Sequence, residues 1–437
     1  MYRLRGLILV LFAAVLALPS LSQAQQSPKD DKYTKEANKH IGLAMVKQAP
    51  EEKLVAYQAA IDALQEGLVA AADNPKIWYI AGQAYAGTKQ FDKAIEAFDK
   101  AVALWPEYKE EVDTEREIAW LGAFEAGVAQ MDAQNYEEAL RILEAGQRLY
   151  DKRPEALLNM GSMYAGTNQL DKAEEAFTKA IESINGPLFA DLDEEGKAQW
   201  KQYERMSLAN IAQIRGQKGV IAFEADNFDE AAEMFAKAAE ANPHSRDYLH
   251  NVAQAYFAKS ENLREARDTA IAPGQAPQDA ELIRIYRALP AQIEKVMPLD
   301  PNNSAMLLIL AVSQRRLGEL TGDTTTGQQS ALVTLQKRAA MTVWLQDIAI
   351  VPGQGDAKVQ GVMMNNTLEP GQSARIRFTL LGAEGAEIAS QEVTVAAAQM
   401  EATCAGATEP CSATTNFEAT IPGVTESVAG WKYAVVN

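Results

Sequence analysis

The sequence predicts two domains of different class: an all-α solenoid followed by an all-β sandwich. The first observation is a seven-residue phrase that occurs five times, each time where a helix is expected to begin. The copies are TKQFDKA at 88–94, AQNYEEA at 133–139, TNQLDKA at 167–173, ADNFDEA at 225–231 and SENLREA at 260–266. The second observation is a change from helical to alternating hydrophobic periodicity beyond about Ala340. A recurring helical unit predicts a solenoid, in which each repeat buries its apolar face against its neighbours.

The most regular repeat runs from residue 75 to residue 106. Gly82 lies on its first helix and Ala94 on its second, and their small side chains allow two antiparallel helices to approach closely. The large side chains of Trp78 and Phe98 fill the space between successive units. This alternation of small and large residues predicts a helical hairpin that stacks on further copies of itself.

The hairpin resembles the tetratricopeptide repeat, with Ala81 in place of a usual leucine. The resemblance covers about residues 37–317 and implies a superhelix whose first helices line a concave, partner-binding groove. The spacing of the copies is uneven, and insertions at 107–117 and 186–206 account for the longer intervals. These insertions either shape a partner site or decorate the surface.

Six segments after residue 340 read as strands, rich in β-branched and aromatic residues and separated by Gly and Pro turns. They are WLQDIAIVP, KVQGVMMN, ARIRFTLL, EIASQEVTVA, TNFEATIP and GWKYAVV. Their number and length predict an immunoglobulin-like β-sandwich. The order of motifs resembles the FxLYD-type domain of exported bacterial proteins, although Leu381-Gly382 replaces the Tyr-Asp of that name.

The N-terminus has the pattern of a secretory signal. Arg3 and Arg5 precede the apolar run LILVLFAAVLAL, and the small residues Ser22 and Ala24 fit cleavage after Ala24. An uncleaved membrane anchor is the alternative, but the apolar run is short for a span. The expected location is the periplasm of a Gram-negative bacterium, with secretion as the alternative.

The composition is acidic and argues against one class of partner. The chain has 41 basic and 59 acidic residues, and loss of Arg3 and Arg5 with the signal moves its formal charge from −18 to −20. Nucleic-acid and anionic-membrane binding depend on neutralising phosphates, so neither is expected. No segment of the mature chain is apolar enough to predict a membrane span.

The two cysteines, Cys404 and Cys411, lie seven residues apart near the C-terminus. In an exported protein this pair is most simply a local disulfide within one domain. A metal site would need more ligands, and a redox-active dithiol would have a different spacing.

Residues able to carry catalysis are few. The three histidines are His40, His244 and His250, and no nucleophile elbow, zinc motif, phosphate loop or dinucleotide fingerprint occurs. The stretch 191–196 imitates a calcium loop, but Gln202 stands where a bidentate glutamate is required, and helix capping by Asp193 explains its acids. We therefore expect no enzyme activity, no cofactor and no metal.

The remaining candidate is the groove that the repeats imply. Its expected lining consists of aromatic, apolar and amide side chains on the first helices: Tyr79, Gln83, Phe124, Val128, Met131, Leu158, Ser162, Val220, Phe223, His250, Gln254 and Phe257. Such a row suits an extended or helical peptide; the alternative is that several members fill the solenoid core or meet an insertion. Some tetratricopeptide proteins hold a terminal carboxylate with Lys and Asn, but Tyr79 and Gln83 occupy those positions here.

The sequence thus divides into a signal segment at 1–24, a lead-in with a capping helix at 25–50, a solenoid at 51–320, a linker at 321–340 and a β-sandwich at 341–437. The leading hypothesis is an exported, non-catalytic scaffold that binds protein partners in envelope assembly or secretion. One alternative is a glycan- or ligand-binding module in which the sandwich recognises the ligand and the repeats act as a spacer. Another is an enzyme whose site matches no familiar motif. The sequence does not indicate the oligomeric state.

Overall fold

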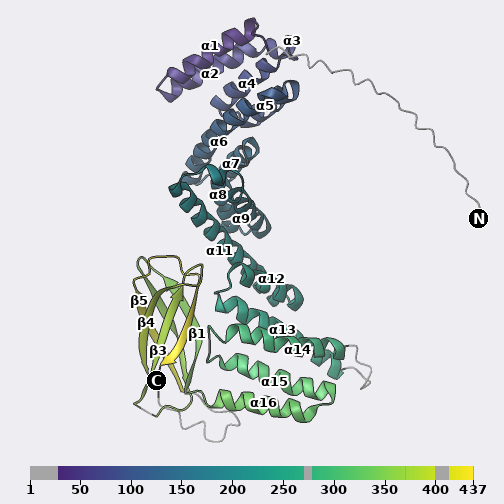
Figure 1. The fold of residues 1–437 in the computed structure, drawn as a ribbon, viewed down its shortest axis with the longest axis vertical. Coiled ribbons are helices and arrows are strands. Elements are labelled where there is room, and N and C mark those ends of the chain that lie inside the picture. The colour runs from purple at the N-terminus through teal and green to yellow at the C-terminus, as the bar shows by residue number, and fades with distance from the viewer. Residues whose placement is uncertain (1–27, 270–277, 370, 399–412, 437) are drawn as a thin grey trace, which may run out of the picture. The chain divides into compact units, whose positions relative to one another are not determined.

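The computed structural model describes residues 28–269, 278–369, 371–398 and 413–436. The chain forms two compact units, one comprising residues up to Ala129 with Arg148–Tyr150, and the other Gln130–Gln147 with the residues from Asp151 onward. Within each unit consecutive helices pair as antiparallel hairpins, and the described residues after the last helix contain six strands (Figure 1). The predicted order, helical repeats and then a β domain, is confirmed. The expected signal segment and both cysteines lie outside the described residues.

The first unit contains the N-terminal hairpins. Its elements are α1 (Lys32–Val46), α2 (Pro50–Leu64), α3 (Gly67–Ala70), α4 (Pro75–Gly87), α5 (Phe91–Leu104), the 3-10 turn η1 (Pro106–Tyr108) and most of α6 (Lys109–Asp132). The capping segment expected at 25–50 holds α1, which packs on α2 as the first half of a hairpin.

The second unit contains the remaining helices and all the strands. Its helices are α7 (Tyr136–Leu149, whose last two residues belong to the first unit), α8 (Glu155–Gly166), α9 (Leu170–Ile184), α10 (Leu188–Asp191), α11 (Glu194–Glu224), α12 (Phe228–Ala241), α13 (Arg246–Thr269), α14 (Gln278–Val296), α15 (Ser304–Thr321) and α16 (Thr324–Ala339). The insertion at 186–206 forms α10 and the beginning of α11, and Asp193 caps α11 as expected, accepting a hydrogen bond from the Gly196 amide at 2.8 Å.

Four of the five copies of the repeated phrase form the same turn between two helices. Their second residues have left-handed backbone conformations: Lys89 (φ 60°), Gln134 (φ 61°), Asn168 (φ 58°) and Asp226 (φ 59°). The third residue then donates its amide five positions back, as Gln90 does to the Tyr85 carbonyl at 2.8 Å. This Schellman-type bond satisfies a carbonyl at the helix end, and the next helix begins after it.

The fifth copy, at 260–266, does not form this turn, so the prediction of a helix start there is wrong. Helix α13 runs without interruption through it. Glu261 occupies the position that is left-handed elsewhere, but its carboxylate pairs with Arg316 of α15 and with Arg264 on the next turn of α13. The pair with Arg264 has the i,i+3 spacing of neighbours on one helix face, so it fits helical backbone at Glu261.

This difference predicts opposite effects of one substitution at equivalent positions. Lys89→Gly removes the steric cost of a left-handed non-glycine residue and is expected to raise the free energy of unfolding by about 0.5–1 kcal/mol. Glu261→Gly places glycine inside a helix and removes the ion pairs with Arg316 and Arg264, and is expected to lower the free energy of unfolding by about 1 kcal/mol or more. Urea unfolding of both variants measures the two signs; equal signs would contradict the assignment of the turns.

Small residues allow close helix packing where the repeat pattern predicted it. A methyl group at Gly161 would lie 2.9 Å from the ring of Phe177, and one at Gly219 would lie 2.7 Å from the ring of Phe235. Gly82 meets Phe98 in the same way. All three phenylalanine rings are fully buried. Each packs into the space left by the missing side chain of the facing glycine.

The segment 321–340, expected to be a linker, is largely helix α16. Asp323 caps it, and its buried residues face α15. Gly318 of α15 and Gly327 of α16 touch through their backbones, because a methyl group on either would lie 2.8 Å from the other's Cα. Glycines and threonines, which suggest a loop in sequence, here permit helix contact. Pro290 lies within continuous α14.

The described residues of the β domain form six strands, at the six segments predicted: β1 (Val343–Pro352), β2 (Asp356–Asn365), β3 (Ser373–Leu381), β4 (Glu387–Ala396), β5 (Ala413–Pro422) and β6 (Gly430–Val436). They form two antiparallel sheets, with strand orders β1-β2-β5 and β4-β3-β6. A bulge interrupts β1 between Gln346 and Ala349. One core, centred on residues such as Ile376, Phe378 and Val359, joins the two sheets.

Candidate protein-binding surface

The first-helix positions expected to line the groove are called the predicted contact row below. They are Tyr79, Gln83, Phe124, Val128, Met131, Leu158, Ser162, Val220, Phe223, His250, Gln254 and Phe257. They lie on α4, α6, α8, α11 and α13. Their surroundings differ from one repeat to the next.

At α4, residues of the chain itself contact the row. The ring of Tyr79 stacks on that of Tyr108 with a centroid distance of 5.2 Å. Its hydroxyl lies 3.2 Å from Glu115, and the Gln83 amide donates to the same carboxylate at 2.7 Å. Burial, followed by the negative charge of Glu115, raises the pKa of Tyr79 above its ordinary range. Tyr108 and Glu115 belong to the insertion at 107–117, so this insertion covers the first two positions of the row.

The α6 members are half-buried. Phe124 stacks on the buried Trp120 one turn earlier, at 5.3 Å between ring centroids and 7° between ring planes. Val128 and Met131 follow on the same helix, also half-buried. The stacking holds the Phe124 ring along its own helix and leaves part of it accessible.

The middle of the row, on α8 and α11, is more open. Ser162 is exposed and donates only to the Leu158 carbonyl of its own helix, at 2.9 Å. Val220 of α11 is 44% exposed. Phe223 is half-buried, in edge-to-face contact with Phe228. Exposed and half-buried apolar side chains beside a hydroxyl leave room for a partner here.

At α13 the row joins a buried polar network. Gln254 Nε2 lies 2.7 Å from His250 Nε2, and Asn303 Nδ2 lies 3.2 Å from His250 Nδ1. Burial, and then the nearby charge of Arg246, lower the pKa of His250 to about 4. His250 is therefore neutral at neutral pH. Phe257, two turns along α13, is half-buried beneath the Arg316 guanidinium, 5.9 Å from its ring centroid.

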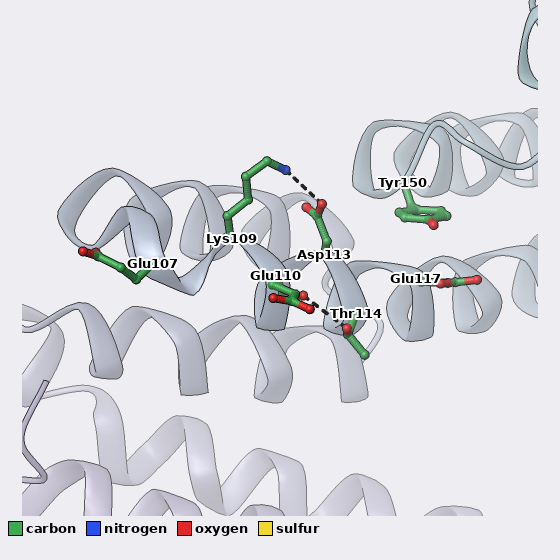
Figure 2. A pocket seen from close by; sticks show the side chains of 7 residues that line it. All are labelled: Glu107, Lys109, Glu110, Asp113, Thr114, Glu117 and Tyr150. Atoms are coloured by element: carbon green, nitrogen blue, oxygen red, sulfur yellow. Dashed lines mark hydrogen bonds and ion pairs between the residues drawn. The ribbon is translucent and has the colours of Figure 1, made fainter. Parts of the chain in front are cut away.

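A separate acidic hollow of about 480 Å³ lies at the beginning of α6, in the insertion at 107–117 for which the sequence left open either a partner site or surface decoration. Figure 2 shows its lining: Glu107, Lys109, Glu110, Asp113, Thr114, Glu117 and Tyr150. Lys109 pairs with Asp113 at 2.9 Å, and the Thr114 hydroxyl donates to the Glu110 carbonyl at 3.2 Å. Four carboxylates make the hollow negative, which favours cationic groups. The sequence signals for it were the insertion itself and the high acid content of 107–117.

Within the described ranges, no group of His, Cys, Asp or Glu is placed to hold a metal ion. In the same residues, no helix is both long and apolar enough to cross a membrane. The disulfide expected between Cys404 and Cys411 stays a prediction, because both residues lie outside the described part of the chain.

Comparison with protein families agrees with the repeat pattern. The tetratricopeptide-repeat model matches residues 56–109, 124–187 and 217–280. These segments fall on the helices described above, so the matched segments have the tetratricopeptide-repeat pattern. A search of curated proteins found no match.

Solved structures with similar helical repeats share little sequence with this chain. A MamA fragment from Desulfovibrio magneticus RS-1 is 20% identical, covers 48% of this chain and 96% of its own, and has a TM-score of 0.20. The TPR2AB domain of yeast Sti1, in complex with pHSP90, is 15% identical over 60% and 91%, with a TM-score of 0.21. YrrB, described as a TPR protein with an unusual peptide-binding site, is 13% identical over 56% and 99%, with a TM-score of 0.23.

Proposed function

We propose that this chain is an exported scaffold that binds a protein partner along the first helices of its middle repeats. Tetratricopeptide repeats offer contact area rather than reactive groups, and a row of apolar side chains beside amides and hydroxyls suits a peptide. A role in envelope assembly or secretion is part of the proposal and derives from the secretory pattern at the N-terminus.

The observation that carries the proposal is the accessibility of the row at α8 and α11. Val220 is 44% exposed, Ser162 is exposed and Phe223 is half-buried. At α4 the insertion covers the row, and at α13 the row belongs to a polar network. The partner is therefore expected to make its main contacts on α8 and α11 rather than along every repeat.

The second candidate, glycan recognition by the β domain, lacks its expected feature. Sugar rings commonly stack on exposed aromatic side chains, and the described β domain has five aromatic residues. These are Trp344, Phe378, Phe417, Trp431 and Tyr433, and all of them are buried. Protein binding by the repeats is accordingly the better-supported function.

The test compares two adjacent exposed residues of α11. Val220→Glu adds a charge on the predicted contact row and is expected to weaken partner recovery from the intact envelope at least tenfold. Ile221, which is 51% exposed, points about 100° away around the helix, and Ile221→Glu is the matched control. Quantitative crosslinking and pull-down against wild type measure the effect.

Both positions are exposed, so the two variants are expected to fold like the wild type, which circular dichroism checks. If Val220→Glu recovers the same partners at wild-type strength, or if only Ile221→Glu loses them, the row is not the binding surface.

A further inference from the structure

The β domain is joined to the helices of its unit by a set of contacts called the seam below. Asn242, before α13, donates to the Ala429 carbonyl at 2.6 Å, and Asn302, before α15, donates to the Val343 carbonyl at 2.9 Å. The Tyr433 amide of β6 donates to the Leu299 carbonyl at 3.2 Å. Strand β6 lies at the edge of its sheet, so the α14–α15 loop satisfies an amide that would otherwise face outward.

The centre of the seam is a buried ion pair. Arg246 of α13 contacts Asp300 Oδ2 through Nε at 2.9 Å and Nη2 at 2.7 Å, and Asp300 is 0% exposed. The Arg246 guanidinium also lies over the Trp431 ring, 5.2 Å from its centroid. Burial raises the pKa of Tyr433 well above its ordinary value, and the charge of Asp300 raises it further. Trp431 and Tyr433 of β6 thus lie beside a salt bridge between α13 and the α14–α15 loop.

An apolar cluster extends the seam beside this ion pair. The cluster consists of three buried residues: Leu307 of α15, Met341 just before β1, and Trp344 of β1. Met297 and Met364 pack against them. Trp344 and Trp431 therefore both face the helices. Apolar burial supplies most of the free energy in such contacts, while the hydrogen bonds determine one orientation.

The polar network continues from the seam into the predicted contact row. Asn303 Nδ2 lies 2.7 Å from Asp300 Oδ2 and 3.2 Å from His250 Nδ1, and His250 in turn contacts Gln254. Arg246, His250 and Gln254 follow one another on α13 at four-residue intervals, so they share one helix face. A continuous chain of contacts therefore leads from β6 to the row.

We propose that docking of the β domain holds His250 and Gln254 in place, so that the β domain and the α13 part of the row form one thermodynamic unit. The β domain then acts as a fixed joint rather than a tethered module. A partner that contacts α13 is linked to β-domain docking, and a change in one equilibrium changes the other by the same factor. This last consequence rests on the proposed function and applies to a partner that reaches α13 in addition to its main contacts on α8 and α11, whereas the joint itself needs no partner.

The test uses a wedge at the seam in the full chain. A methyl group at Gly430 would overlap the backbone carbonyl of His244, and the nearest atoms it meets all belong to that helix-side residue. Gly430→Ala is therefore expected to open the seam while leaving the β domain folded. Gly166→Ala is the matched control, because a methyl group there meets nothing within 4 Å.

Two readouts follow. Hydrogen exchange in fragments 430–436 and 246–257 is expected to become at least tenfold faster in Gly430→Ala, with 373–396 unchanged as evidence of a folded β domain. In ¹³C-histidine spectra, the pKa of His250 is expected to rise from about 4 toward 6.5. Three histidines are present, and His250→Gln assigns the signal.

Faster exchange in 430–436 with an unchanged His250 titration would overturn the coupling. Slow exchange in both fragments would show that the wedge leaves the seam closed, which would overturn the docking geometry. If Gly430→Ala does not fold, hydrogen exchange of the wild-type protein provides the test. A Tyr433 amide that exchanges at the rate of an amide without a hydrogen bond would contradict its bond to Leu299 and thus the seam. None of these results depends on a partner, so the Val220→Glu outcome stays separate.

Discussion

Phe177→Ala is expected to lower the free energy of unfolding of the second unit by about 3–5 kcal/mol. Phe177 is 1% exposed, and its ring fills the space left by Gly161 of the preceding helix. Truncation removes the transfer free energy of a buried ring and leaves a cavity between α8 and α9, which the flanking helices close only in part. Denaturant unfolding followed by circular dichroism measures the loss.

The pairing with Gly161 makes this prediction sharper. Gly161→Ala alone places a methyl group 2.9 Å from the ring and is expected to destabilise by about 1–3 kcal/mol. In the Phe177→Ala background the same methyl group enters the cavity, and alanine also favours the helix, so the substitution is expected to be neutral or stabilising. If Gly161→Ala has the same cost in both backgrounds, the two residues do not share the contact described.

Asp300→Ala is expected to destabilise the second unit by about 3–5 kcal/mol, because it leaves the half-buried Arg246 without its main counter-charge. Burial acts to lower the pKa of Arg246, but the charges and hydrogen bonds of Asp300 and Asp247 together outweigh it, and the pKa is raised. Removing one partner of a buried ion pair costs more than the pair itself contributes, since the remaining charge stays desolvated. Thermal and urea unfolding of the full chain measure the effect.

Asp247→Ala is the matched control, because Asp247 pairs with the same arginine. Its carboxylate lies 2.9 Å from Arg246 Nη1, but its side chain is 57% exposed. Exposed pairs contribute about 0–1 kcal/mol, so this variant is expected to stay within that range. Similar losses from the two substitutions would show that burial of Asp300 is not what makes its ion pair important.

Much of the fold was predictable because it depends on local periodicity. A glycine is followed by a facing phenylalanine at the same interval in three repeats, as at Gly161 and Phe177. The six strand segments alternate apolar and polar residues. The helical repeats and the β domain could therefore both be predicted, in the right order. The contact row was predictable only as a list of positions. Nothing near Tyr79 in sequence indicated that Tyr108 and Glu115 would cover it, because those contacts depend on where an insertion folds back.

The five copies of the repeated phrase show that a local sequence pattern does not always determine the local structure. Four copies form the left-handed turn, but at 260–266 a contact with Arg316, 55 residues away, favours continuous helix. The residues Thr324–Gly327 were likewise expected to form part of a linker. Gly327 permits close backbone contact with α15, and the sequence of the segment does not show that α15 packs there. Residue patterns are short-range, and these outcomes depend on partners brought together by folding.

By itself the sequence determined a stack of helical hairpins, a following β domain, an acidic surface and a small set of first-helix positions. These follow from spacing and composition, which act between near neighbours in the chain. Tertiary structure alone decided that both tryptophans of the β domain face the helices, and that Asp300 joins β6 to His250. Burial and hydrogen bonding between residues from 37 to 187 positions apart arise only once the chain has folded.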